Sequence, residues 1–272
     1  MQRAGHLILK GIIFTVLTAL TQIGGIAYAV ASLAWSAQRR RHIPTALTRF
    51  LVPATAITLY AVMTAFVAPP LAAHWGRQRL PCTQGETLVP ATRLTCWLNR
   101  GYVSSETLTL LSDLGHDLSR RFPGSRLGVL EGGFPFIDGF PLVPHLSHRD
   151  GRKVDLSFFY LDENGNPRPD GSPSTLGYFV YVQPTATDTQ PCRNRFTPLR
   201  WDFAWLQTDA PNWPMDAQRT QWMVHWLKNR PEVVRLFLEP HLAERLGENG
   251  GKLRFQGCQA ARHDDHLHVQ TR

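Results

Sequence analysis

Two short segments far apart in the chain concentrate the side chains that bind metals in proteins. One is PHLSHRDGRKVD, residues 144–155, and the other is ARHDDHLHVQTR, residues 261–272. Five of the eleven histidines of the chain fall in these segments, so the pair is more specific than either cluster alone. The candidate residues are His145, His148, Asp155, His263, His266 and His268.

The spacing within each segment favours convergence. If HLHVQ is a strand, His266 and His268 point to the same face, because side chains of a strand repeat every two residues. Asp155 begins a second predicted strand on the face opposite its apolar neighbours. The loop before it carries His148, and Gly151 eases the turn that would bring the imidazole back to the carboxylate.

Three imidazoles and one carboxylate suit zinc. A catalytic zinc ion typically takes three protein ligands and keeps a fourth position for water. These four side chains exceed the three ligand places by one, which leaves one histidine for proton transfer. The alternative is that the first histidine pair arises by chance and that the second segment is a solvated, charged end of the chain.

The elements that would position these residues belong to a predicted mixed α+β domain at residues 74–272. Helices and strands do not alternate regularly, which favours a mixed or antiparallel sheet over a doubly wound one. Apolar periodicity and capping residues predict helices at 104–122, 216–230 and 240–247. Aromatic and β-branched content predicts strands at 126–133, 153–160, 178–183, 232–239 and 266–270.

The second predicted helix leaves two interpretations open. Its Trp222 and Trp226 lie one turn apart. They are expected to pack in the core, and the alternative is that they wall a substrate groove.

Two uncharged stretches, residues 11–35 and 50–73, precede the domain. Each exceeds the roughly 20 residues that cross a bilayer as a helix, whereas a cleavable signal has an apolar region of only about 7 to 15 residues. Residues 1–73 are therefore predicted to form two transmembrane helices.

Positive charge predicts the orientation of this hairpin. The connection between the two stretches holds Arg39, Arg40, Arg41 and Arg49, whereas each outer flank offers two basic residues, Arg3 and Lys10 or Arg77 and Arg79. By the positive-inside rule the connection is cytoplasmic, and both ends of the hairpin lie outside.

The net charge of +8 follows from the same residues. Residues 1–73 hold six of the 29 Lys and Arg residues and none of the 21 Asp and Glu residues, so the remainder nearly balances. The folded domain thus lacks the basic excess of a nucleic-acid-binding protein, and nucleic acid is not an expected partner.

Four cysteines, Cys82, Cys96, Cys192 and Cys258, follow the second uncharged stretch without CxxC spacing. An even number on the outer side of a membrane predicts two disulfides. Pairing Cys82 with Cys96 and Cys192 with Cys258 is the most economical of three connectivities. If the orientation is inverted, the alternative is four reduced thiols.

HLSHRDGRKVD followed by HDDHLHV resembles the paired His-x6-Asp and His-x-His motifs of the penicillin-insensitive murein endopeptidases and their zinc D-Ala-D-Ala peptidase relatives. The resemblance covers roughly residues 126–270, where PEVVRLFLEPHLAERL is similar to the strand and helix that precede the second motif. Two features depart from the family: Lys153 replaces a usual acidic residue, and paired membrane helices replace an ordinary export signal.

The resemblance implies a role for each candidate residue. Zinc would be held by His148, Asp155 and His268. His266 would be the catalytic base, with His263 as the second candidate for it, and His145 would lie beside the ligands.

The expected function is hydrolysis of peptide bonds in murein, as a zinc-dependent D,D-endopeptidase in the periplasm, anchored to the cytoplasmic membrane. The chain has no G-x-S-x-G motif, and disulfide-bonded cysteines make poor nucleophiles. The alternatives are a D,D- or L,D-carboxypeptidase of the cell wall, a protease of envelope proteins, and a non-catalytic membrane protein that binds the wall or a metal. The sequence carries no signal of the oligomeric state.

Overall fold

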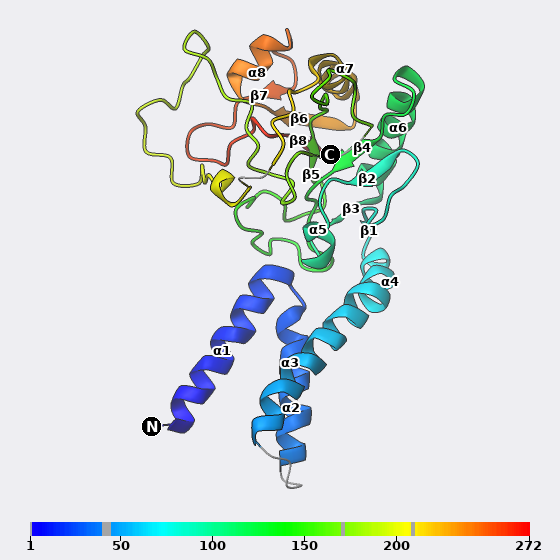
Figure 1. Ribbon diagram of the computed structural model, residues 1–272. Helices are drawn as coiled ribbons and strands as arrows, with labels where there is room; N and C mark the ends of the chain where they lie inside the picture. The colour runs from blue at the N-terminus through cyan, green and yellow to red at the C-terminus, as the bar shows by residue number, and fades with distance from the viewer. Residues whose placement is uncertain (1, 40–44, 170–171, 208–209) are drawn as a thin grey trace.

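The structure is a computed structural model that describes residues 2–39, 45–169, 172–207 and 210–272. It has a helical stem followed by an α+β domain (Figure 1). The stem consists of α1 (Gln2–Thr21), α2 (Gly24–Arg39), α3 (Thr45–Val62), a π-helical turn (Met63–Val67) and α4 (Ala68–His74).

The domain is built on a six-stranded mixed sheet of order β2-β4-β5-β8-β6-β7. Its strands are β2 (Leu88–Pro90), β4 (Leu127–Val129), β5 (Lys153–Ser157), β6 (Val233–Phe237), β7 (Leu253–Arg254) and β8 (His266–Thr271). A separate antiparallel pair joins β1 (Arg77–Arg79) to β3 (Tyr102–Ser104). The predicted mixed sheet is confirmed.

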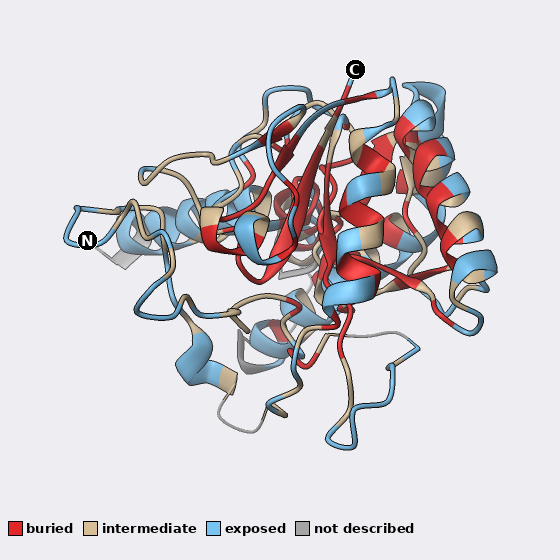
Figure 2. Cartoon of the chain, turned by 90° about the horizontal axis from the view of Figure 1, so that it is seen from above, coloured by how far each residue is buried: buried red, intermediate tan, exposed pale blue. Residues whose placement is uncertain are grey.

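The longer helices of the domain cover the sheet. They are α6 (Ser105–Arg121) and α7 (Ala217–Lys228), with the shorter α5 (Leu94–Trp97), α8 (Pro240–Arg245) and a 3-10 turn (Ala204–Gln207) elsewhere. Buried residues gather in the sheet and on the helix faces turned toward it, while the outer helix faces are exposed (Figure 2). Leu114 of α6, Met223 of α7 and Leu267 of β8 belong to this core.

Local signals explain why these helices begin where they do. The Ser104 hydroxyl accepts a hydrogen bond from the Thr107 amide, and the Asp216 carboxylate accepts one from the Arg219 amide. Both are N-caps that satisfy an amide left free by the first helical turn. The predicted helices and the Asp216 cap are confirmed.

The two tryptophans of α7 pack against the core. Trp222 makes an edge contact with Phe122, and Trp226 Nε1 donates to the Asp117 carboxylate at 2.8 Å. The core interpretation is therefore confirmed, and the groove alternative is not.

The strand predicted at 178–183 is wrong. Phe179 has a φ of 70°, which no strand residue adopts, and residues 178–183 have irregular structure. Their amides bond to the segment before β8: Phe179 N–H donates to Asp265 Oδ2 at 2.6 Å, and Val182 N–H donates to the Asp264 carbonyl at 2.7 Å. These backbone hydrogen bonds hold the segment beside the second histidine cluster.

The first uncharged stretch is not the single helix expected at 11–35. α1 ends at Thr21 and α2 begins at Gly24, and between them Gln22 has a φ of 65°. The chain reverses here, so that α2 runs back along α1 (Figure 1). Gly25 permits the close approach, because a Cβ there would lie 2.7 Å from the Phe14 carbonyl oxygen.

The reversal divides the first predicted span into two helices of different length. Within the described residues, two helices are long and apolar enough to cross a membrane, Ala4–Thr21 and Leu47–His74, and Gly24–Ala37 is a shorter apolar helix. The start of α1 lies at the end of the stem away from the domain (Figure 1). The start of α1 and the end of α4 thus lie at opposite ends of the stem (Figure 1). The orientation of the stem in a membrane stays a prediction.

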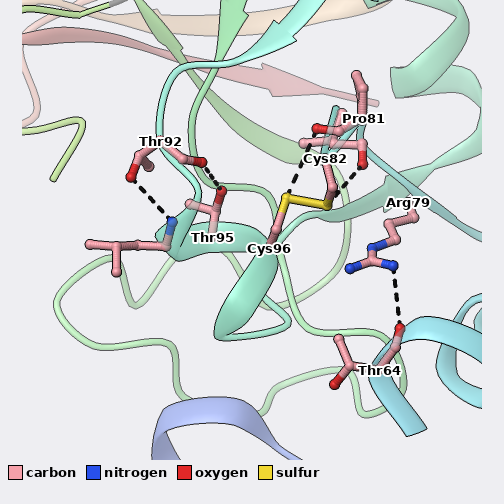
Figure 3. The surroundings of a disulfide bond; sticks show 9 residues. Thr64, Arg79, Pro81, Cys82, Thr92, Thr95 and Cys96 are labelled. Carbon is pink, nitrogen blue, oxygen red and sulfur yellow. Dashed lines mark hydrogen bonds between the residues drawn. A yellow bond between two sulfur atoms is a disulfide. The ribbon is translucent and has the colours of Figure 1, made fainter. Parts of the chain in front are cut away.

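Both predicted disulfides, Cys82–Cys96 and Cys192–Cys258, are present. The first ties α5 to the chain after β1, next to the point where Arg79 Nη1 donates to the Thr64 carbonyl of the stem at 3.3 Å (Figure 3). It therefore stabilises the domain where the domain meets the stem.

A second contact joins the stem to the loop after β4. The Gln22 side-chain oxygen accepts a hydrogen bond from the Phe136 amide at 3.0 Å. Ile23 packs in a small core with Ala68 and Tyr102. The loop that carries His145 and His148 thus begins against the turn between α1 and α2.

Candidate metal centre

Neighbouring strands bring the two sequence clusters together. β5 and β8 are antiparallel partners, with Asp155 opposite His268 and Ser157 opposite His266. Asp155, His266 and His268 therefore share one face of the sheet, and all three are at most 2% exposed. The predicted strand and the shared face of the two histidines are confirmed.

The loop between β4 and β5 adds the other two histidines. Gly151, with a φ of 70°, makes the turn into β5. His148 Nδ1 donates to the Gly132 carbonyl at 2.8 Å, which leaves its Nε2 facing the strands. His145 Nδ1 lies 3.1 Å from Asp155 Oδ2. Four of the five candidate histidines, His145, His148, His266 and His268, thus lie around the Asp155 carboxylate.

Three ligand atoms form a compact triangle. His148 Nε2 lies 3.0 Å from His268 Nδ1 and 3.2 Å from Asp155 Oδ1, and His268 Nδ1 lies 2.9 Å from the same oxygen. Zinc bonds of about 2.0–2.1 Å in a tetrahedral arrangement place ligand atoms about 3.3–3.4 Å apart. Small movements would therefore admit an ion.

A second trio shares two of these residues. His145, His148 and Asp155 offer ligand atoms within 4.8 Å of one another, and they could hold a metal ion. His145 Nδ1, however, also lies 2.8 Å from Glu131 Oε2, so it stands between two carboxylates. His148 and Asp155 could therefore hold a metal ion together with either His145 or His268.

His266 has the hydrogen bonding of a base held in one tautomer. Its Nδ1 bonds to the Asp265 carboxylate, and its Nε2 is buried, has no hydrogen-bond partner among the described residues, and lies 3.6 Å from Asp155 Oδ2. The His263 ring lies beside it, with the two ring centroids 5.0 Å apart.

Burial and charge move the pKa values of these histidines in opposite directions. Burial lowers the pKa of His268 to about 4, although Asp155 opposes this, and it lowers that of His263 well below the usual value. For His145 the effect of burial is outweighed by Asp155 and Glu131, which raise its pKa to about 10. For His266, Asp155 and Asp265 likewise outweigh burial and raise the pKa.

Three residues that sequence reasoning missed complete the site. Tyr178 O–H donates to Asp155 Oδ2 at 2.9 Å, and its ring contacts the rings of His145 and His266. Burial, followed by the charge of Asp155, raises the pKa of Tyr178 well above 10, so it remains a donor. Arg100 Nε lies 2.8 Å from Glu131 Oε1. Glu131 could have been predicted as a site residue, because in VLEGG an acidic residue directly follows the apolar end of a strand. The sequence around Tyr178 carries no comparable signal.

The centre is closed in this structure. The candidate ligands and His266 are at most 3% exposed, apart from His145, whose side chain is 9% exposed. Lys153, at the start of β5, forms an ion pair with Asp150.

No protein-family model and no curated protein matches the chain. The resemblance of the two motifs to the murein endopeptidases therefore stays a prediction.

Proposed function

We propose that the chain is a zinc metallopeptidase of the cell envelope that hydrolyses peptide bonds in murein, most specifically as a D,D-endopeptidase. The observation that supports it best is the triangle of His148 Nε2, Asp155 Oδ1 and His268 Nδ1 with the unpartnered Nε2 of His266 beside it. Three ligands and one adjacent base are the minimal set of a hydrolytic zinc site.

The protonation of the histidines favours His268 over His145 as the third ligand. A ligand imidazole must be neutral, and the lowered pKa of His268 keeps it so. His145, with a pKa near 10, retains its proton between Glu131 and Asp155. In the proposed site it orients the Asp155 carboxylate without contacting the metal.

Zinc would polarise the substrate carbonyl and lower the pKa of a bound water. The His266 side chain is placed to accept the proton of the attacking water at Nε2 and to return it to the leaving amine. Asp265 keeps the other proton on Nδ1 and fixes the orientation of the ring. His263, whose pKa is lowered by burial, is the second candidate for this role.

Access to the centre requires Tyr178 to move. Its ring contacts the rings of His145 and His266, and its hydroxyl donates to Asp155 Oδ2. Displacing the irregular segment 174–182 would open the centre without breaking the sheet, because this segment belongs to no strand.

The burial of the ligands also favours a second candidate function. Structural metal sites are closed, whereas catalytic sites keep an open position. A non-catalytic membrane protein that binds a metal to stabilise this domain would need only the triangle, and it would leave the Asp265–His266 pair without a role.

The stem supports a location at the cytoplasmic membrane with the domain in the periplasm. The start of α1 and the start of α3 lie at the end of the stem away from the domain (Figure 1). Among the described residues, the basic residues of the stem are Arg3 and Lys10 of α1, Arg39 at the end of α2 and Arg49 near the start of α3, and residues 1–73 contain no Asp or Glu. By the positive-inside rule this end is cytoplasmic.

Digestion of murein by the zinc-loaded full-length chain tests the proposal. We expect mass spectrometry to show cross-linked fragments converted to uncross-linked ones, with His266→Ala as the matched inactive control. Release of single alanine residues with the cross-links intact would indicate a carboxypeptidase. Stoichiometric zinc without any released fragment would indicate the non-catalytic function.

A further inference from the structure

A groove runs along the stem on the side where α1 and α3 face each other. It encloses about 500 Å³ and is lined by α1 between His6 and Leu17, α2 between Tyr28 and Ser36, and α3 between Thr48 and Ile57. α2 forms a fixed wall, because Trp35 Nε1 donates to the Thr55 hydroxyl of α3 at 2.8 Å.

The groove has a cationic end and an apolar end. His6 and Lys10 lie one turn apart on α1, and Arg49 lies near the start of α3. The start of α1 and the start of α3 share the end of the stem away from the domain (Figure 1), with Lys10 near the middle of α1 and Arg49 close to the start of α3. Residues 1–73 contain no Asp or Glu, so the stem provides no carboxylate for these cations. An anion from outside the chain is the natural counter-charge.

The rest of the groove is mainly apolar, with a few hydroxyl groups among its lining residues. Leu17, Tyr28 and Ile57 line its end nearest the domain. Ser32 Oγ, which lines the middle, is buried and has no hydrogen-bond partner among the residues described. From His6 to Leu17 the helix rises about 16 Å, which is roughly half of a 30 Å hydrocarbon core. The groove therefore matches one leaflet in length.

We propose that this groove binds one anionic glycerophospholipid. Its phosphate lies between Lys10 and Arg49, its ester region accepts a hydrogen bond from Ser32, and an acyl chain fills the space between α1 and α3. Basic pockets between transmembrane helices bind anionic head groups in this way. The site is independent of the metal centre and of the proposed peptidase activity.

The test uses the full-length chain in nanodiscs made of equal parts phosphatidylglycerol and phosphatidylcholine. Native mass spectrometry of the released protein identifies the lipid that remains bound. We expect phosphatidylglycerol to be enriched about tenfold over phosphatidylcholine in the wild type, and the enrichment to disappear in Lys10→Ala/Arg49→Ala. Bound lipid in the bulk ratio in the wild type, or unchanged enrichment in the double variant, overturns the proposal.

Two further variants distinguish lipid binding in the groove from non-specific attraction of anionic lipid to a basic protein. Ile57→Trp obstructs the apolar end at an exposed position and retains every cation. Arg235→Ala/Arg254→Ala removes two exposed charges from the domain. We expect the first to abolish the enrichment and the second to retain it. Enrichment that survives Ile57→Trp, or that is lost in the domain variant, overturns the groove as the binding site.

Discussion

Asp155 lies directly opposite His268 in the antiparallel pair of β5 and β8, and Asp155 Oδ1 is 2.9 Å from His268 Nδ1. The strand register therefore holds two of the three proposed ligands in place before any metal binds. Preorganisation of this kind removes part of the ordering cost that binding would otherwise carry.

The first prediction concerns which histidines are ligands. His148→Ala and His268→Ala should each lose the single bound zinc ion, because a three-ligand site cannot spare one of them. His145→Ala should retain zinc with about 10- to 100-fold weaker affinity, as expected for a residue that only orients a ligand. Metal analysis and competition with a chelator measure both. Zinc retained by His268→Ala and lost by His145→Ala would assign the third position to His145.

The base is tested by His266→Ala. This variant should keep stoichiometric zinc and lose about 10²- to 10⁴-fold in the rate of murein cleavage, the usual cost of removing a general base. Asp265→Asn should lose part of the rate, because the bond that orients His266 is weakened. Near-normal cleavage by His266→Ala would exclude it as the base, and His263→Ala would be the next variant to assay.

Tyr178→Phe removes the hydroxyl that donates to Asp155 and leaves the ring in place. We expect zinc affinity to fall by about 10- to 100-fold, since the hydroxyl is bonded to a ligand carboxylate. Isothermal titration of the metal-free protein with zinc provides the measurement. Unchanged affinity together with unchanged cleavage would show that Tyr178 only covers the site.

Stability should depend on pH through Asp117. Hydrogen bonds from Arg120 and Trp226 hold its carboxyl pKa below the usual value. A pKa that is lower in the folded state stabilises the protein above the unfolded pKa of about 3.9, and this stabilisation is lost as the pH falls through the folded value. Asp117→Asn should therefore lower the free energy of unfolding by roughly 0.5 kcal/mol at pH 7, as expected for a solvent-screened pair, and by less at pH 2.5. Thermal unfolding of both proteins at the two pH values checks this, and an equal shift at both would contradict the charge-based explanation.

The reversal at Gln22 predicts that the two ends of the stem lie on opposite sides of the membrane. A reporter that is active only outside the cytoplasm should work when fused after His74 and fail when fused before α1. The same result from both fusions would place both ends on one side of the membrane, as in the simple hairpin.

Local sequence periodicity was sufficient to predict the helices and strands that pack against the core. The leucines of α6, the Asp216 cap of α7 and the alternation in β8 were readable because each pattern has the period of its own element. The histidine and aspartate spacing likewise predicted one site before any contact was known, and the order of the cysteines favoured the pairing that the structure contains.

Other features depend on contacts between distant residues. Nothing near Tyr178 indicates its bond to Asp155, because the segment 178–183 takes its shape from Asp264 and Asp265 and not from a strand partner. The break at Gln22 was not predicted because the absence of charged residues does not distinguish one long helix from two shorter ones.

The sequence alone determined which side chains could bind a metal and that two segments had to supply them, because side-chain chemistry and spacing are local properties. Only the tertiary structure decided that Asp155 faces His268, that Glu131 and Tyr178 join the site, and that the stem folds back on itself. Those outcomes depend on strand register and on hydrogen bonds across many residues, and no pattern within a short segment records them.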